Sequence, residues 1–331
     1  MKKFFALLFT VPVIATAQPK FGVLVNGKMN LDTKVRVAQE LNVSYIRDAI
    51  VLQNWNGGDE STNRFMNAGF KIILNVNWGL VAKGPGMKES VPFPTDTVEY
   101  KKILDKVLDK YKPEVVVVEN EETTKNYHTG PIEDYINELS AAITVAHSKG
   151  LKITNGGITN RDLVLLVYYD YLERKMKKEA DDFASRCVKP ALLRNSQVQD
   201  IVAKAKKLVQ AYKNLPLDYV NIHLYEPVKN TAGGTDESVR TITPGAQKEI
   251  IRYIERVTGK RAMSNEVGAR ASSPEVVTGV LQQLSETDMA YVIWFSGDGS
   301  GGSVALHNED GSLRQNGIAF KNFMADHNDK K

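Results

Sequence analysis

The sequence predicts an α/β protein of the (β/α)8 class, the TIM barrel, on three observations. Eight short apolar or β-branched runs alternate with longer stretches of helical spacing. The runs are continuously apolar, most plainly at residues 115–118, as is typical of parallel strands buried on both faces. The 331 residues suffice for such a barrel, usually about 250 residues long, and leave room for an insertion. A doubly wound sheet is the alternative, but residues 25–28 lack the glycine-rich phosphate turn that usually follows its first strand.

The expected strands and helices follow in order along the chain. The strands are residues 21–25, 43–47, 71–76, 114–118, 152–155, 218–223, 261–264 and 290–295. The helices between them include residues 31–41, 99–112, 131–149, 244–258 and 274–287. Pro131, Pro244 and Pro274 suit the first turns of three of these helices, where the missing backbone N–H would have no partner anyway.

The segment between the fifth and sixth strands is longer than one helical crossover needs. Residues 161–215 are predicted to form two or three amphipathic helices, including residues 171–178 and 200–213. No linker rich in Pro, Gly or Ser brackets the segment, which disfavours a separate domain. We therefore predict one domain over residues 18–331, with a helical insertion at about 161–215.

The first 17 residues have the pattern of a secretory signal peptide. Lys2 and Lys3 precede an apolar run at residues 4–13, and residues 15–17 offer a small-x-small cleavage site before Gln18. The run is too short to span a bilayer. We expect a secreted or periplasmic protein with no membrane association after cleavage. Cys187 is the only cysteine, so the exported chain would have no internal disulfide.

Composition and motifs exclude several classes of function. The 43 Lys and Arg and 39 Asp and Glu residues give a small, dispersed net charge of +4, which disfavours nucleic acid as a partner. The five histidines lack metal-ligand spacing, and neither a Gly-x-Ser-x-Gly elbow nor a phosphate loop is present. We expect no metal and no cofactor.

Polar residues stand where the expected strands end, the place where functional side chains gather in a barrel. Among them are Arg47, Asp48, Asn75, Asn77, Trp78, Glu119, Asn120, Glu121, Asn155, His223, Tyr225, Asn265, Glu266 and Trp294. Glu121 and Glu266 each follow an Asn, after strands four and seven, which lie roughly opposite each other in an eight-stranded ring.

Two carboxyl groups that face each other across a pocket can cleave a glycosidic bond. One protonates the leaving group while the other attacks the anomeric carbon, and a separation of about 5–5.5 Å favours retention of configuration. Burial and mutual repulsion would move the two pKa values apart. Glu119 is the alternative to Glu121, in which case the roles shift by two residues.

With these motifs, the sequence resembles the retaining glycoside hydrolases of clan A, the barrel superfamily of cellulases, mannanases and xylanases. The resemblance implies that Glu121 is the acid/base and Glu266 the nucleophile in an enzyme that cleaves β-linked poly- or oligosaccharides. Its other implied carbohydrate-site residues are Arg47, Asn120, His223, Tyr225 and Trp294. Of these, Arg47 would keep the nucleophile ionised, Asn120 would bind the sugar 2-hydroxyl, Tyr225 would hold the nucleophile, and Trp294 would floor the subsite. Asn75 and Trp78, at the end of the third expected strand, are further candidates for substrate binding.

Two departures from the family pattern leave other functions open. Asn75 and Asn77 stand where cellulase-like members often have a His, and Glu122 stands where Pro often follows the acid/base. A barrel that binds carbohydrate without cleaving it is the first alternative. A structural protein of the surface or cell wall, without saccharide affinity, is the second. Trp55, Trp78 and Tyr127 are candidates for neighbouring sugar subsites, because aromatic faces stack on pyranose rings.

Overall fold

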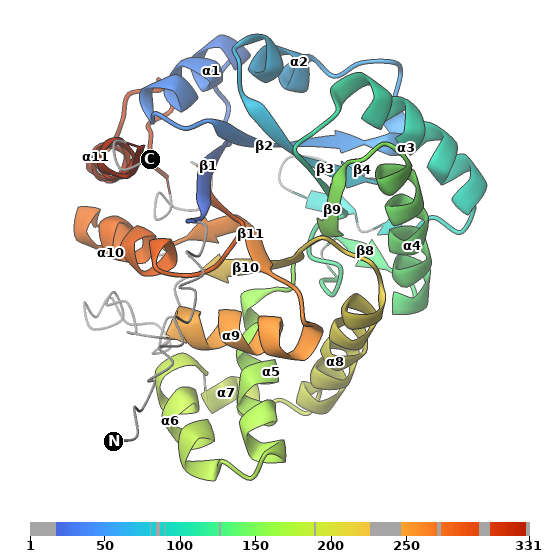
Figure 1. Cartoon of the computed structure of the whole chain (residues 1–331), viewed down its shortest axis with the longest axis vertical. Helices are drawn as coiled ribbons and strands as arrows, with labels where there is room; N and C mark the ends of the chain where they lie inside the picture. The colour runs from blue at the N-terminus through green and yellow to red at the C-terminus, as the bar shows by residue number, and fades with distance from the viewer. Residues whose placement is uncertain are drawn as a thin grey trace, which may run out of the picture.

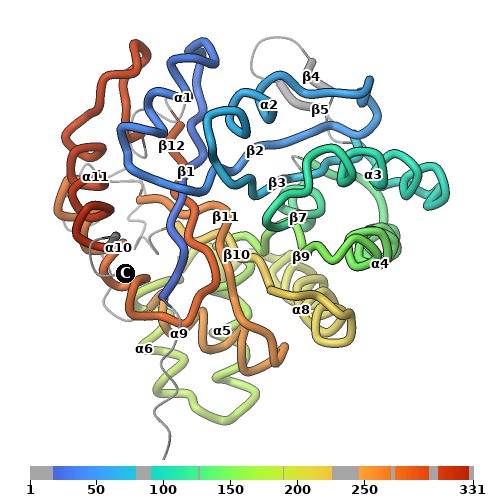
Figure 2. The backbone as a smooth tube through the Cα atoms, turned by 45° about the horizontal axis from the view of Figure 1, so that its top comes forward, coloured from blue at the N-terminus to red at the C-terminus, as the bar shows by residue number. Residues whose placement is uncertain are grey.

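The computed structural model describes residues 18–79, 81–83, 87–89, 91–125, 127–188, 190–225, 246–269, 273–297 and 305–328. Within these ranges, eight parallel strands form one sheet in the order β10-β11-β12-β1-β2-β3-β7-β9. They are β1 (Lys20–Val25), β2 (Tyr45–Val51), β3 (Lys71–Asn77), β7 (Val115–Val118), β9 (Lys152–Asn155), β10 (Val220–Tyr225), β11 (Ala262–Gly268) and β12 (Tyr291–Ser296). The first and last of these strands, β1 and β12, lie side by side along their full length (Figure 2).

The sheet curls into a nearly closed barrel whose seam lies between β9 and β10. Ile158 bridges to Ile222 across this seam. The side chain of Asn155 accepts the backbone N–H of Asn221 at 2.7 Å and donates to its carbonyl at 3.0 Å. Side-chain hydrogen bonds thus replace part of a strand ladder, and the predicted (β/α)8 fold is confirmed.

Helices surround the strands (Figure 1). They are α1 (Leu31–Glu40), α2 (Glu60–Asn67), α3 (Thr97–Tyr111), α4 (Ile132–Ser148), α5 (Asn160–Glu173), α6 (Lys177–Cys187), α7 (Pro190–Leu193), α8 (Val198–Asn214), α9 (Ala246–Thr258), α10 (Pro274–Ser285) and α11 (Gln315–Asn328), with a 3-10 turn η1 (Leu52–Asn54). Asn30, Asp59, Asp96, Thr159 and Ser273 cap helix starts with their side chains. None of the described helices is long and apolar enough to cross a membrane.

Two short pairs of strands lie outside the barrel sheet. β4 (Val81–Lys83) pairs antiparallel with β5 (Met87–Glu89), and β6 (Val91–Pro92) pairs in parallel with β8 (His128–Thr129). The expected signal peptide at residues 1–17 and Pro244 lie outside the described residues.

The segment between β9 and β10 contains the four helices α5 to α8. The expected helix over residues 171–178 is wrong, because α5 ends at Glu173 and Lys175 has a left-handed φ of 60° before α6 begins. α6 lies beneath α9 in Figure 1 and packs on α5 and α9. That this segment is an insertion into a simpler barrel stays a prediction.

Several element ends differ from the sequence expectation. β2 continues to Val51 and β11 to Gly268, four residues beyond their expected ends. Arg47, expected as the last residue of its strand, therefore lies within β2, and Glu266, expected after its strand, lies within β11. Pro274 occupies the expected first turn of α10, whereas Pro131 is the residue before α4.

Alternation along the strands separates two cores. Tyr45, Ile73, Val115, Val117, Met263, Ala290, Tyr291 and Ile293 fill the barrel interior. Residues between them, such as Ile46, Val116 and Val292, belong to the larger core between strands and helices. The alternation of side chains along each strand therefore decides which residues face the end of the barrel where the candidate site lies.

Candidate active site

A bulge in β11 brings two consecutive residues into the site. Between Asn221 and His223 of β10, the pairing on β11 advances from Met263 to Glu266, so β11 carries one extra residue. Such a bulge redirects side chains that would otherwise alternate. Asn265 and Glu266 therefore both face the barrel, as their contacts with neighbouring strands show below.

The loop after β7 brings a second consecutive pair, Asn120 and Glu121, into the site through an unusual backbone conformation. Glu119 and Glu121 have left-handed backbone angles, with φ of 65° and 46°. These angles are sparsely populated by residues other than Gly. As a result, Asn120 and Glu121 both lie at the site, whereas the side chains of Glu119 and Glu122 are buried, each residue 1% exposed.

Arg47 connects both pairs. Its Nη1 lies 2.5 Å from Oε2 of Glu266 and its Nη2 lies 2.6 Å from Oδ1 of Asn120. It also donates to Oδ1 of Asn75 at 3.1 Å and to the carbonyl of Asn265 at 3.2 Å. Because a guanidinium only donates, these bonds assign the amide oxygen of Asn120 to Arg47 and leave its amide N–H groups for other partners.

The Glu266 carboxylate is held at both oxygens. Besides the contact of Oε2 with Arg47, Oε1 accepts the hydroxyl of Tyr225 at 2.5 Å. Burial opposes ionisation of Glu266, but the charges of His223 and Arg47 and the Tyr225 hydrogen bond outweigh it, so its pKa falls to about 2. Glu266 is therefore a carboxylate at any ordinary pH.

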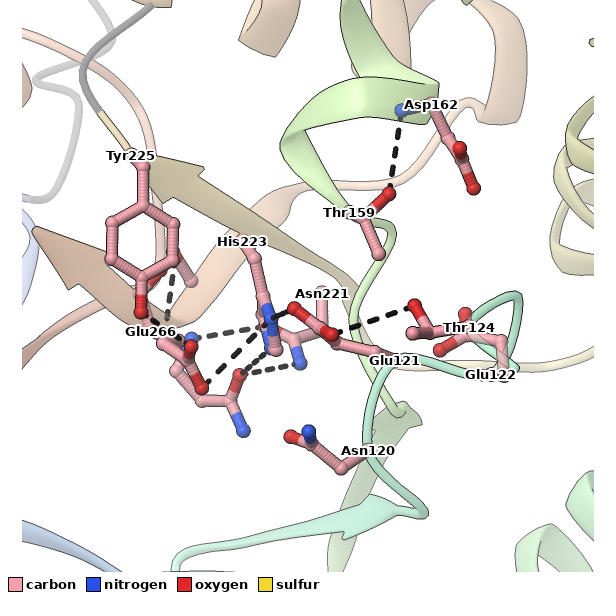
Figure 3. Close-up of polar contacts among 12 residues, drawn as sticks. Asn120, Glu121, Glu122, Thr124, Thr159, Asp162, Asn221, His223, Tyr225 and Glu266 are labelled. Carbon is pink, nitrogen blue, oxygen red and sulfur yellow. Dashed lines mark hydrogen bonds and ion pairs between the residues drawn. The ribbon is translucent and has the colours of Figure 1, made fainter. Parts of the chain in front are cut away.

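His223 lies between the two candidate carboxyl groups (Figure 3). Its Nδ1 is 3.0 Å from Oε1 of Glu121 and 3.9 Å from Oε2 of Glu266, and its side chain is 0% exposed. Its Nε2 is 3.0 Å from Oδ1 of Asn265, an oxygen that also accepts Nδ2 of Asn221 at 2.7 Å.

The orientation of this amide fixes the histidine tautomer. Since Oδ1 of Asn265 can only accept, Nε2 of His223 carries a proton. Nδ1 then either donates to an ionised Glu121 or accepts from a protonated one, so the pair shares one labile proton. Burial alone would lower the pKa of His223. The negative charges of Glu266 and Glu121 and the hydrogen bond with Glu121 together outweigh burial, so the pKa of His223 is raised.

A cavity of about 370 Å³ opens beside Glu266. It extends from Arg47, Asn120 and Glu266 toward β1 and α2. Its wall consists of Leu24, Val25, Asn26, Lys34, Arg47, Asp48, Ala49, Ser61, Phe65, Asn75, Asn77, Asn120, Tyr127, Glu266 and Phe295. The lining combines hydrogen-bonding groups with aromatic rings, as a saccharide would require.

Glu121, His223 and Glu266 each present one ligand atom within 4.8 Å of the others. These distances are compatible with a bound metal ion. However, both oxygens of Glu266 already bind Arg47 and Tyr225, and the guanidinium places a positive charge where an ion would bind. The donor set therefore suits carboxyl chemistry better than a metal.

The alternative acid, Glu119, points away from the cavity. Its Oε1 accepts the backbone N–H of Trp78 at 2.6 Å, and its side chain is 1% exposed. The side chain of Glu121 is 20% exposed and contacts His223. Of the two carboxyl groups, only Glu121 is within reach of Glu266.

The predicted role of Trp294 is wrong. Its side chain is 0% exposed and packs edge-on against Phe320 of α11, so it has no free face for a sugar. The reason is parity: Tyr291 and Ile293 face the barrel interior, so Trp294 faces the helices and Phe295 faces the cavity.

The remaining predicted residues divide between the cavity and the surrounding core. Asn75 lines the cavity, and so does Tyr127. Trp78 is half-buried and packs against Tyr100, and Trp55 packs against Tyr111. Asn26 and Phe295 also line the cavity and Asn221 binds Asn265, but none of the three was predicted from the sequence. Phe295 could have been found from strand alternation, because Tyr291, Ile293 and Phe295 are alternate residues of one strand and therefore face the same side.

Solved structures of (β/α)8 glycoside hydrolases share this fold, so the predicted resemblance in fold is confirmed. The β-glycosidase BGL167 matches with a TM-score of 0.58 at 12% identity, over 93% of this chain and 96% of that one. A GH128 (subgroup II) endo-β-1,3-glucanase from Sorangium cellulosum matches with a TM-score of 0.51 at 14% identity, over 91% and 97%. A GH30 endoxylanase from Clostridium papyrosolvens matches with 0.50 at 13%, over 94% and 72%. No family model and no curated protein matches the sequence.

Proposed function

We propose that this protein is an exported glycoside hydrolase that cleaves a β-linked glycan with retention of configuration. One observation supports this most strongly: an oxygen of Glu121 and an oxygen of Glu266 lie within 4.8 Å of each other. Retaining enzymes place their carboxyl groups about 5–5.5 Å apart, whereas inverting enzymes need about 6.5–9.5 Å to admit a water.

The electrostatics of the pair suit the two roles. Glu266, kept ionised by Arg47 and Tyr225, attacks the anomeric carbon. Glu121, which shares a proton with His223, protonates the departing oxygen and afterwards deprotonates the water that releases the sugar. The amide nitrogen of Asn120, whose oxygen is held by Arg47, is a donor suited to the 2-hydroxyl of the attacked sugar.

The position of the cavity indicates which part of the substrate it binds. The cavity includes Glu266 but not Glu121 in its wall, so it holds the sugar that is attacked rather than the leaving group. A β-1,3-glucan is the first substrate to test, because the Sorangium neighbour is named as an endo-β-1,3-glucanase. Xylan, β-mannan and aryl β-glycosides complete the panel.

The test compares wild-type protein with Glu266→Gln and Glu121→Ala. We expect hydrolysis of at least one substrate, loss of turnover in Glu266→Gln, and partial recovery of Glu121→Ala by azide or an activated aryl leaving group. The first-formed product should keep the β configuration by NMR. Unchanged turnover in both variants would refute the assignment. Saccharide binding by wild-type protein without any cleavage would favour the non-catalytic barrel instead.

A further inference from the structure

Two buried carboxyl groups flank the candidate acid/base without facing the cavity. We propose that Glu119 and Glu122 are positioning residues, which hold the loop after β7 so that Glu121 reaches the leaving-group oxygen. This inference rests on the proposed function.

The backbone of this loop needs to be held. Glu119 and Glu121 both adopt left-handed angles that side chains other than Gly disfavour. Such conformations persist only where the surrounding structure fixes them, and they concentrate at functional sites. The two turns direct Asn120 and Glu121 inward together, so a relaxed loop would withdraw the acid from the site.

Glu119 anchors the loop on its upstream side. Its Oε1 accepts the N–H of Trp78 at 2.6 Å, which ties the loop to the end of β3. Its Oε2 lies 3.7 Å from Nε2 of His128 and, like both carboxyl oxygens of Glu138 on α4, is buried without a hydrogen-bond partner among the described residues. Burial raises the pKa of both Glu119 and Glu138.

Glu122 anchors the loop on its downstream side. Its Oε1 accepts Nδ2 of Asn155 at 3.0 Å and the hydroxyl of Tyr212 on α8. Its Oε2 lies only 2.9 Å from the point where a Cβ on Gly156 would sit, so the residue after β9 must be small to admit it. The two anchors thus fasten the loop to the end of β3, to β9 and to α8.

Stability alone explains these residues poorly. Replacing buried ionic or polar groups by well-packed apolar ones is often neutral or stabilising. Two carboxyl groups that are each 1% exposed therefore call for a role that an apolar side chain could not fill. Accepting a backbone N–H at one side of Glu121 and an amide and hydroxyl at the other is such a role.

The test compares two substrates that differ in their need for an acid, because a general loss of stability would affect both substrates equally. An aryl glycoside with a dinitrophenolate leaving group needs no proton from Glu121, whereas a natural glycan does. Glu121 is still needed as a base in the later hydrolysis step, so the comparison uses kcat/KM, which reports departure of the leaving group. We expect Glu119→Ala to lower kcat/KM on the glycan by about 10- to 100-fold and to change kcat/KM on the aryl glycoside by less than about 3-fold. Glu119→Gln keeps an acceptor for the backbone N–H of Trp78, so it should restore kcat/KM on the glycan.

Tyr212→Phe and Asp218→Ala complete the experiment. Tyr212→Phe removes one hydroxyl from Glu122 and should show the same selective loss on the glycan, even if Glu119→Ala does not fold. Asp218 binds Lys152 at 2.8 Å and the N–H of Ile153 at 3.0 Å at the far end of β9, so its Ala variant controls for lost stability. Melting temperatures are recorded for all variants.

The outcomes separate this inference from the proposed function. Equal losses on both substrates, or a loss in Asp218→Ala that matches the others at similar melting temperature, would overturn the positioning role. Unchanged kcat/KM on the glycan in both Glu119→Ala and Tyr212→Phe would overturn it as well. Failure of folded wild-type protein to cleave any glycoside would instead overturn the proposed function, and the inference with it.

Discussion

The contact between Arg47 and Glu266 predicts how activity depends on pH. Arg47 is one of three groups that lower the pKa of Glu266 to about 2 against the effect of burial. Removing one partner of a buried ion pair costs about 3–5 kcal/mol. At 1.36 kcal/mol per pKa unit, Arg47→Met should raise the pKa of Glu266 by about 2–4 units, to about 4–6.

The sign of the effect follows from which form is active. The nucleophile must be ionised, so a raised pKa removes activity on the acidic side only. With a pKa of 6, about one tenth of Glu266 would be ionised at pH 5, whereas the wild-type residue is almost wholly ionised there. Tyr225→Phe removes one hydrogen bond to the charged group, about 1.5–3 kcal/mol, and should shift the acidic limb by about 1–2 units.

The assay is kcat/KM between about pH 3.5 and 8, because this ratio reports the pKa values of the free enzyme. A dinitrophenyl glycoside removes the dependence on the acid. Arg64→Met serves as control, since Arg64 pairs with Asp32 at 2.9 Å on the surface and is 50% exposed. An acidic limb in Arg47→Met that coincides with that of the wild-type protein would refute the reasoning about the nucleophile.

Two further predictions concern the walls of the site. Gly157 has φ +121° and a Cβ there would lie 2.3 Å from Nε2 of His223, so Gly157→Ala should displace the imidazole and lower kcat at least 10-fold, about 1.4 kcal/mol. Gly150→Ala, at φ +70° with open space around it, should cost only about 1 kcal/mol of stability and no activity, and equal kcat in the two variants would contradict the prediction. Phe295→Ala should raise KM with little change in melting temperature, whereas Trp294→Ala should destabilise the fold by about 3–5 kcal/mol in denaturant titrations; the opposite assignment would show that the strand parity is misread.

The order of strands and helices could be predicted because burial on both faces leaves a plain signal in the sequence. The Val115–Val118 run shows it most directly, since all four residues are wholly buried. The same pattern located the polar residues at the strand ends, and Arg47, Asn120, Glu121 and Glu266 do lie together.

Side-chain direction was harder to predict, because one residue of slip reverses the face. The Trp294 assignment failed for this reason: the aromatic residue that lines the cavity is its neighbour Phe295. The bulge in β11 and the left-handed turns after β7 change the alternation locally, and neither has a strong signal in a single sequence. The choice between Glu119 and Glu121 needed the structure for that reason.

The central claim is that Glu266 forms a covalent bond to the sugar. The direct measurement is to incubate the protein with a 2-deoxy-2-fluoro glycosyl fluoride of the sugar it cleaves, and to locate the adduct by peptide mass spectrometry. The fluorine slows release of the intermediate, so the account predicts one added sugar per chain, attached to Glu266 and absent in Glu266→Gln. An adduct on another carboxylate, or hydrolysis with inverted product configuration and no adduct, would contradict it.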